Sequence, residues 1–229
     1  MVYHANTTHC DENELVISER FNFRRAIVPE DLVSLRVLQS TLFPVQYSDT
    51  FYDNLLREDY ETILAFSTDD DVEALCGVAT ARVSEMSHEP HSSCCSPVEI
   101  EGYIMTLGVA PSRRGMGLGS HLLKMIKEVM IHEVQCDILT LHVKAGNEPA
   151  FRLYQNHDFV IAENLPKHYI IDNKLYDAAR LLYRHRDNQS CLDHILVPMI
   201  GLCLPVANLV NRVSSRVTDR IFGRAVLPL

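Results

Sequence analysis

The amino-acid sequence predicts a mixed α/β fold in one domain, followed by a basic amphipathic tail. Two observations predict the fold class. Strand-like apolar segments alternate with helix-like segments of 3.6-residue period, and one strand runs through a glycine-rich turn directly into an amphipathic helix. With 229 residues, of which 47% are hydrophobic, the chain has enough apolar side chains for one sizeable core.

The first 19 residues are predicted to form a disordered N-terminal segment. They are polar, include four acidic residues, and lack the basic segment and apolar stretch of a secretory signal. We therefore expect the domain to cover residues 20–186.

The first half of this domain is predicted to contain three strands and two helices. Pro29-Glu30-Asp31 supplies a proline and an acidic first turn, which are typical of a helix N-terminus. Ser48 and Asp49 favour the start of a second helix. In chain order the elements are a strand at 21–27, helices from about 29 to 42 and at 48–56, and strands at 62–67 and 74–83.

The second half begins with a polar loop at 84–97. An amphipathic helix is predicted from about 117 to 134, because its apolar residues recur on one face: Leu122, Leu123, Ile126, Val129 and Met130. The other expected elements are strands at 99–109 and 138–143, a helix at 147–156, and strands near 160 and at 181–183.

Charge is unevenly distributed along the chain. The formal net charge is −9, yet the segment from residue 184 onward holds six arginines against three aspartates. The body is therefore strongly acidic, which argues against nucleic acid as the main partner and favours a substrate that arrives as a cation.

The seven cysteines include no C-x-x-C pair, which argues against a disulfide framework and favours a reducing compartment. His88, His91, Cys94 and Cys95 stand at irregular spacing in a loop rich in serine and proline. We interpret this segment as a flexible loop and expect no metal site.

A glycine-rich segment provides the strongest indication of function. Gly115, Gly117 and Gly119 separate a strand from a helix, so the backbone can approach a bulky anion while the unpaired N–H groups of the helix start point towards it. A pyrophosphate is the expected ligand, although the same segment could be a helix entry that binds nothing. The segment matches neither the dinucleotide pattern G-x-G-x-x-G nor a P-loop.

The pattern R-x-x-G-x-G from Arg114 to Gly119 resembles the acetyl-CoA signature of GNAT acetyltransferases, and the resemblance extends over about residues 21–183. It implies the GNAT fold, a mixed and mostly antiparallel twisted sheet flanked by helices, with acetyl-CoA as co-substrate. Backbone N–H groups from Leu107 to Val109 would meet the thioester oxygen, and Gly108 predicts a bulge that splays the strands.

A second segment resembles the family's N-x-x-A…Y…G-F helix. Asn147 would contact the coenzyme arm and Tyr154 would lie near the thiol, whereas Asp158 replaces the usual glycine. The full set of expected coenzyme-binding residues is Leu107, Gly108, Val109, Arg114, Gly115, Met116, Gly117, Leu118, Gly119, Ser120, Asn147 and Tyr154.

Within this family the chain resembles protein N-terminal acetyltransferases of the E and F types. The segments 43–47, 102–109 and 141–143 are similar to three motifs of that group, and 165–169 is similar to the F type. The resemblance implies acetylation of the free α-amino group of protein N-termini that begin with methionine and a hydrophobic or amphipathic residue. It also implies a monomer at the cytosolic face of Golgi or other endomembranes, or otherwise in the cytoplasm, with histones as possible substrates.

The same resemblance implies roles for individual residues. Tyr103 and His142 match the family's water-mediated base pair, although a structural histidine is the alternative for His142. Tyr154 would protonate or position the departing sulfur, or would serve only in packing. The first substrate side chain would be walled by Phe43, Pro44, Val45, Tyr47, Met105 and Tyr169, although Phe43 and Pro44 could instead be core residues.

Two other functions remain open: a lysine or histone acetyltransferase with the same coenzyme site, and a catalytically silent acyl-CoA-binding adaptor. Peptide libraries with free and blocked N-termini distinguish them.

The tail over residues 187–229 is predicted to associate with membranes. Arg212, Arg216, Arg220 and Arg224 recur every four residues in step with Leu209, Val213, Val217 and Ile221, as on an interfacial helix. The apolar stretch before them is interrupted by Pro198 and Pro205, so lying on a bilayer is favoured over crossing it. Docking on the domain itself or on a protein partner is the alternative.

Overall fold

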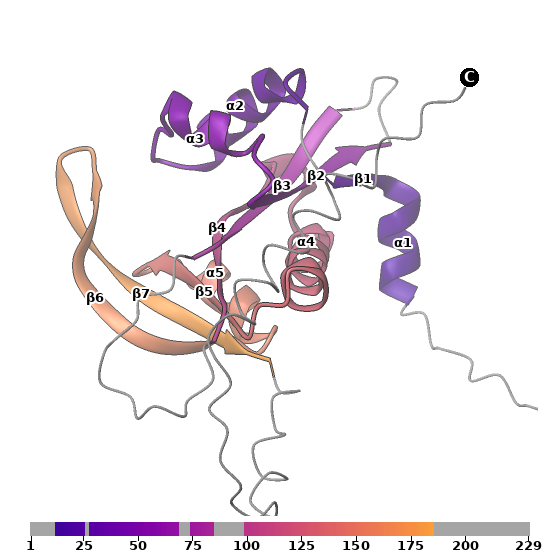
Figure 1. Cartoon of the computed structure of the whole chain (residues 1–229). Helices are drawn as coiled ribbons and strands as arrows, with labels where there is room; N and C mark the ends of the chain where they lie inside the picture. Colours follow the sequence, from indigo (N-terminus) through magenta and orange to yellow (C-terminus); the bar gives the residue numbers. More distant parts are fainter. Residues whose placement is uncertain (1–11, 26–27, 69–73, 85–98, 186–229) are drawn as a thin grey trace, which may run out of the picture. The chain divides into compact units, whose positions relative to one another are not determined.

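A seven-stranded sheet forms the centre of the computed structural model, which describes residues 12–25, 28–68, 74–84 and 99–185 (Figure 1). The strand order is β1-β2-β3-β4-β5-β7-β6. Only β4 and β5 pair in parallel among the described strands, so the predicted mixed and mostly antiparallel sheet is confirmed. The strands are β1 (Phe21–Arg25), β2 (Tyr60–Ser67), β3 (Ala74–Val83), β4 (Glu101–Val109), β5 (Ile138–Lys144), β6 (Val160–Ile171) and β7 (Lys174–Arg184).

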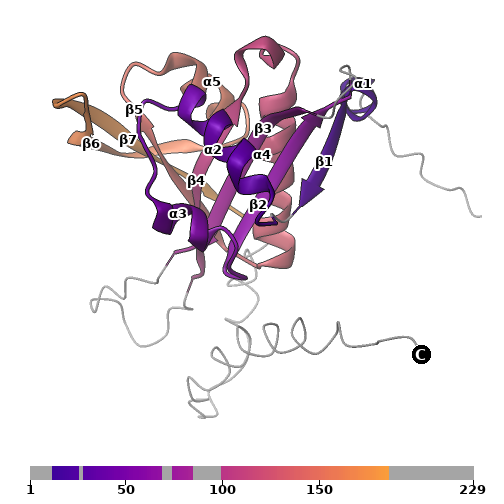
Figure 2. The same cartoon turned by 90° about the horizontal axis from the view of Figure 1, so that it is seen from above.

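Helices cover both faces of the sheet (Figures 1 and 2). On one face α2 and α3 pack against the central strands through a cluster that includes Leu35, Tyr52 and Leu64. On the other face α1, α4 and α5 contribute to a larger cluster around Leu122 and Ile126, both fully buried. The helices are α1 (Glu12–Arg20), α2 (Asp31–Leu42), α3 (Asp49–Asn54), η1 (Pro111–Arg113), α4 (Leu118–Glu128), the π-helical turn η2 (Val129–Glu133) and α5 (Glu148–Gln155).

The N-terminal segment departs from the prediction of disorder over residues 1–19. Residues 12–20 form α1, and Ile17 is only 7% exposed within the core cluster that also contains Leu118. A short polar helix gains its stability from tertiary packing rather than from its own composition, which is why a reading of polarity alone was wrong here. Residues 1–11 lie outside the described part.

The C-terminal hairpin is longer than the two short strands that were predicted. β6 and β7 pair from Val160↔Leu182 to Ile171↔Lys174, with interruptions in register. Their turn residues Asp172 and Asn173 both have positive φ, 49° and 59°, which fits the tight turns that favour aspartate and asparagine. This hairpin extends beyond the rest of the sheet in Figure 1.

No helix in the described ranges is both long enough and apolar enough to cross a bilayer. The predicted tail over 187–229 and the predicted flexible loop around His88 to Cys95 lie outside these ranges.

Candidate active site

The sheet opens between β4 and β5. The two strands pair only from Glu101↔Ile138 to Tyr103↔Thr140, while β5 continues to pair with β7 along its whole length. Beyond Tyr103, β4 therefore has no described strand partner on its β5 side. This leaves backbone groups of residues 104–109 available to a ligand that enters the opening.

A bulge accompanies this opening, but it lies at Met105 and not at the predicted Gly108. Thr80 pairs with Thr106 and Ala81 with Ile104, so Met105 is the extra residue. Gly108 itself stays in register with β3, and packing against α2 explains why a glycine stands there. A Cβ at position 108 would lie 2.6 Å from Leu42 Cδ1 and 3.0 Å from Phe43 Cζ, so the close approach of α2 requires glycine.

The glycine-rich loop has the backbone geometry of an anion cradle. Gly115 and Gly117 have φ of 75° and 81°, in the left-handed region that glycine favours, and Gly117 is the N-cap of α4 without a side-chain cap. The first-turn N–H groups of α4 have no intrahelical acceptor. The Arg114 Nε donates to the carbonyl of Val109 at 3.1 Å, which ties the loop to the end of β4.

These features fit a coenzyme pyrophosphate at the start of α4. Leu118 is 1% exposed, so its side chain belongs to the core and only its backbone could contact the coenzyme. Met116 is half-buried and also packs against that core.

Asn147 and Tyr154 both have structural roles. The sequence analysis gave packing as an alternative for Tyr154 but no structural role for Asn147. The Asn147 side chain accepts a hydrogen bond from the N–H of Ala150 and caps α5. Tyr154 is buried and contacts Phe159 in a T-shaped arrangement, and burial raises its pKa strongly. A protonated phenol at this place suits either a proton donor or a packing residue.

Asp158 preserves the local geometry that a glycine would favour. Its φ is 68°, and the chain after α5 closes through hydrogen bonds from the N–H groups of His157 and Phe159 to the carbonyl of Tyr154. The departure from the family pattern therefore leaves this helix end intact.

Tyr103 and His142 meet on the strands that flank the opening. The Tyr103 hydroxyl lies 2.9 Å from His142 Nδ1. Burial raises the pKa of Tyr103, and burial together with the charges of His168 and Arg180 lowers the pKa of His142. Both pKa shifts favour the neutral form of the group. In the tautomer with the imidazole proton on Nε2, the Tyr103 hydroxyl donates to Nδ1.

The hairpin of β6 and β7 also contacts His142. The His168 ring stacks on that of His142 with 4.7 Å between centroids, and the Tyr169 hydroxyl donates to the carbonyl of His142 at 3.3 Å. Burial, with a smaller contribution from Tyr103, raises the pKa of Tyr169 to about 12. The structure thus brings the predicted Tyr169 next to Tyr103 and His142.

Sequence reasoning missed a polar network beside the pair. Glu101 accepts hydrogen bonds from Thr140 and from Arg180, the latter at 3.3 Å, and Arg180 lies opposite His142 in the β5–β7 register. Among the unpredicted residues near Tyr103 and His142, only His168 had a usable signal in the sequence, since it adjoins the predicted Tyr169. Glu101, Thr140 and Arg180 are ordinary strand residues, and they meet only because of the order of the strands in the sheet.

The predicted substrate wall is divided between buried and exposed side chains. Phe43 and Tyr47 are half-buried and contact each other edge to face, with centroids 5.9 Å apart. Pro44 and Val45 are exposed, so Pro44 is not the core residue of the alternative interpretation, and Phe43 is only half-buried. Met105 packs against the α2–α3 cluster, on the same face as this loop.

The described residues contain no group of three or more histidine, cysteine or acidic side chains arranged to hold a metal ion.

Comparison with known proteins identifies the family. The model of the acetyltransferase (GNAT) family matches residues 32–159. The chain is 29% identical over 143 residues to N-alpha-acetyltransferase 50 of Danio rerio, covering 62% of this chain and 77% of that protein. It is 28% identical over 158 residues to N-alpha-acetyltransferase 60 of the same organism, covering 67% of this chain and 65% of that protein.

A solved structure supports this assignment. Arabidopsis thaliana NAA60 in complex with a bisubstrate analogue has a TM-score of 0.65 and 27% identity, over 72% of this chain and 99% of that chain. The chain belongs to the acetyltransferase (GNAT) family and is an acetyl-CoA-dependent acyltransferase.

Proposed function

We propose that this enzyme transfers the acetyl group of acetyl-CoA to the free α-amino group of protein N-termini, with Tyr103 and His142 as its base pair. The observation that carries the proposal is the 2.9 Å contact between these two side chains at the opening between β4 and β5. A terminal amine has a pKa near ~8 and a lysine amine near ~10.4, so a weak neutral base suits the former substrate.

The proton path follows from the hydrogen bond. When the Tyr103 oxygen takes a proton from the amine through a water molecule, Tyr103 passes its own hydroxyl proton to His142 Nδ1. The imidazole becomes an imidazolium, and the amine attacks the thioester carbon without a covalent enzyme intermediate. The departing thiolate takes a proton, and Tyr154 is the donor that the family resemblance implies.

The substrate side chain would be recognised by the loop between α2 and α3 together with Met105 and Tyr169. Their apolar and aromatic surfaces fit an N-terminal methionine followed by a hydrophobic or amphipathic residue. In support, a solved Arabidopsis thaliana Naa50 structure, 26% identical, contains the bisubstrate analogue CoA-Ac-MVNAL, with 72% of this chain and 99% of that chain covered and a TM-score of 0.58.

The cellular location is part of the proposal. The basic and apolar stripes of residues 209–224 favour attachment to the cytosolic face of a membrane, and resemblance to the F type favours the Golgi.

Acetylation of internal lysines is the second candidate. It has one observation in its favour, a 27% identity over 168 residues to the Arabidopsis thaliana protein called Histone acetyltransferase MCC1, with 69% of this chain and 68% of that protein covered.

Kinetics of two variants test the base pair. Tyr103→Phe and His142→Ala should each lower kcat by ~10² with little change in acetyl-CoA affinity, because a general base contributes to the transition state only. Tyr60→Phe, in a strand distant from β5 in the sheet order, is the matched control. Normal turnover in either variant would remove that residue from the pair.

A further inference from the structure

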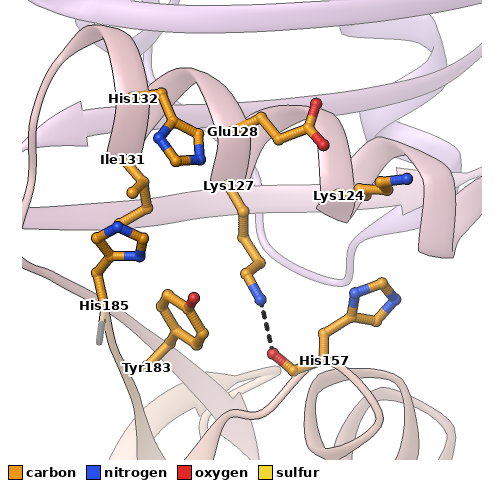
Figure 3. Close-up of a pocket in the computed structure, with 8 residues that line it drawn as sticks. All are labelled: Lys124, Lys127, Glu128, Ile131, His132, His157, Tyr183 and His185. Atoms are coloured by element: carbon orange, nitrogen blue, oxygen red, sulfur yellow. Dashed lines mark hydrogen bonds between the residues drawn. The ribbon is translucent and has the colours of Figure 1, made fainter. Parts of the chain in front are cut away.

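A pocket with a volume of about 170 Å³ opens beside the C-terminal end of α4 (Figure 3). Its described lining residues include neither Tyr103 nor His142. They come from α4, from η2, from the turn after α5 and from the end of β7. Four separate segments of the chain therefore converge on this pocket.

The lining is rich in nitrogen-bearing side chains that are cationic or become so on protonation. They are Lys124, Lys127, His132, His157 and His185, whereas Glu128 is the only carboxylate among the described lining residues. Such a concentration is unexpected in a chain with a net charge of −9. It indicates a local positive potential within an acidic protein.

Lys127 lines the pocket and contacts both the turn after α5 and the end of β7. Its Nζ donates to the carbonyl of His157 at 2.8 Å and lies 3.8 Å from the centroid of the Tyr183 ring. An ammonium has three N–H donors, and the carbonyl takes one of them. Figure 3 shows this side chain reaching across the pocket between Tyr183 and His157.

The electrostatics of the pocket have the sign expected of a site for an anion. Burial lowers the pKa of Lys127. The pKa of His157 is lowered by burial and by the charges of Lys127 and Lys124, while Asp158 opposes these effects. The charges of Lys127 and Lys124, which lower the pKa of His157, would be offset by an anion bound beside them.

We propose that this pocket binds a phosphate monoester. A tetrahedral oxyanion presents acceptors in several directions, which matches donors that arrive from α4, η2 and β7. A metal ion is disfavoured, because the two lysines repel cations and the His132 and His185 rings cross edge to face at 5.4 Å. The volume admits the phosphate together with part of the group that carries it.

Two sources of this chemistry are open to the site: free phosphate compounds, and the headgroup of a membrane lipid. His185 lines the pocket and stands two residues before the tail for which we proposed membrane attachment. This closeness in sequence makes a lipid phosphate the second source to test. This step alone depends on the proposed location, and binding of phosphate does not depend on acetyl transfer.

The test uses the full chain and inorganic phosphate as the first probe. We expect phosphate to move the imidazole resonances of His157 and His132 in NMR spectra and to raise the pKa of His157, beyond the effect of chloride at equal ionic strength. Lys127→Gln should weaken phosphate binding at least tenfold. Lys174→Gln, at the exposed first residue of β7 outside the pocket, should bind as the unmodified chain does.

Lys124→Gln serves as the second variant, because Lys124 is exposed and its replacement leaves the contacts of Lys127 intact. It should also weaken phosphate binding, so the result does not depend on whether Lys127→Gln folds. The proposal is overturned if phosphate moves the histidine resonances no more than chloride does. Equal phosphate affinity of the Lys124→Gln and Lys174→Gln chains would overturn it as well.

Vesicle flotation distinguishes the sources. Phosphatidylcholine vesicles containing phosphatidic acid, a phosphate monoester, are compared with vesicles containing phosphatidylserine at matched charge. A preference for phosphatidic acid that is lost in Lys124→Gln supports a lipid headgroup. Binding of inorganic phosphate without that preference supports a free phosphate compound as the ligand.

Discussion

Replacing Gly108 by alanine tests how the sheet opening and the substrate loop are coupled. The added Cβ would lie 2.6 Å from Leu42 Cδ1 and 3.0 Å from Phe43 Cζ, both closer than van der Waals contact allows. Overpacking of this kind costs about 1–3 kcal/mol, offset in part by about 0.4–1 kcal/mol from the lower entropy of the unfolded chain. Because Phe43 must move, the KM for the peptide should rise together with the loss of stability.

Gly119→Ala is the matched control. Its Cβ would meet only Val109 Cγ2 at 3.7 Å and Leu153 Cδ2 at 3.9 Å, and alanine is favoured over glycine inside a helix. The net cost of up to about 2.6 kcal/mol should lower the Tm of Gly108→Ala by up to roughly 10 °C in thermal denaturation, whereas Gly119→Ala should not lower it. Gly119→Ala should instead weaken acetyl-CoA binding. An unchanged Tm and an unchanged peptide KM for Gly108→Ala would refute the described packing of Phe43 on β4.

Three further predictions follow from the site and the tail. Asp158→Gly should stabilise the protein by about 0.5 kcal/mol in chemical denaturation, because glycine relieves the positive φ of 68° but adds unfolded-state entropy; a loss of stability would contradict this. Since His142 must be neutral to accept a proton and its pKa is lowered, kcat/KM should fall only below about pH 6.5. His168→Phe removes the electrostatic contribution of His168 that lowers the pKa of His142, so the acid limb should move to higher pH, and an unmoved limb would exclude that contribution. A chain ending at Arg186 should keep its activity on soluble peptides but lose membrane binding in cell fractionation, and a wild-type chain already free of membranes would contradict the proposed attachment.

Sequence patterns predicted most of the fold and the parts of the site that depend on local geometry. The glycine-rich turn, the amphipathic α4 and the strand β5 each reflect a local sequence pattern or a local backbone requirement, and all three stand in the structure. What depends on tertiary contacts could not be predicted in the same way. The helix α1 is anchored by Ile17 in a distant core, and Gly108 is required by the approach of Leu42 and Phe43 rather than by a bulge.

The same distinction explains the polar groups around the proposed base pair. Glu101 and Arg180 come within 3.3 Å only because β5 lies between β4 and β7 in the sheet. Residues 79 positions apart carry no sign of this contact in their own sequence neighbourhoods. Tyr103 and His142 were identified through resemblance to a family, and their hydrogen bond now supplies a physical reason for the pairing.

Acetyl transfer to matched peptides tests the central claim most directly. Three peptides share one sequence that begins with methionine and leucine and contains one internal lysine: one with a free N-terminus, one with a blocked N-terminus, and one with a free N-terminus and the lysine replaced by arginine. Incorporation of acetyl groups from acetyl-CoA, located by mass spectrometry, should be equal for the first and third peptides and absent for the second. Faster acetylation of the blocked peptide, at its lysine, would contradict the claim, and coenzyme binding without any product would show that the chain is not the enzyme described.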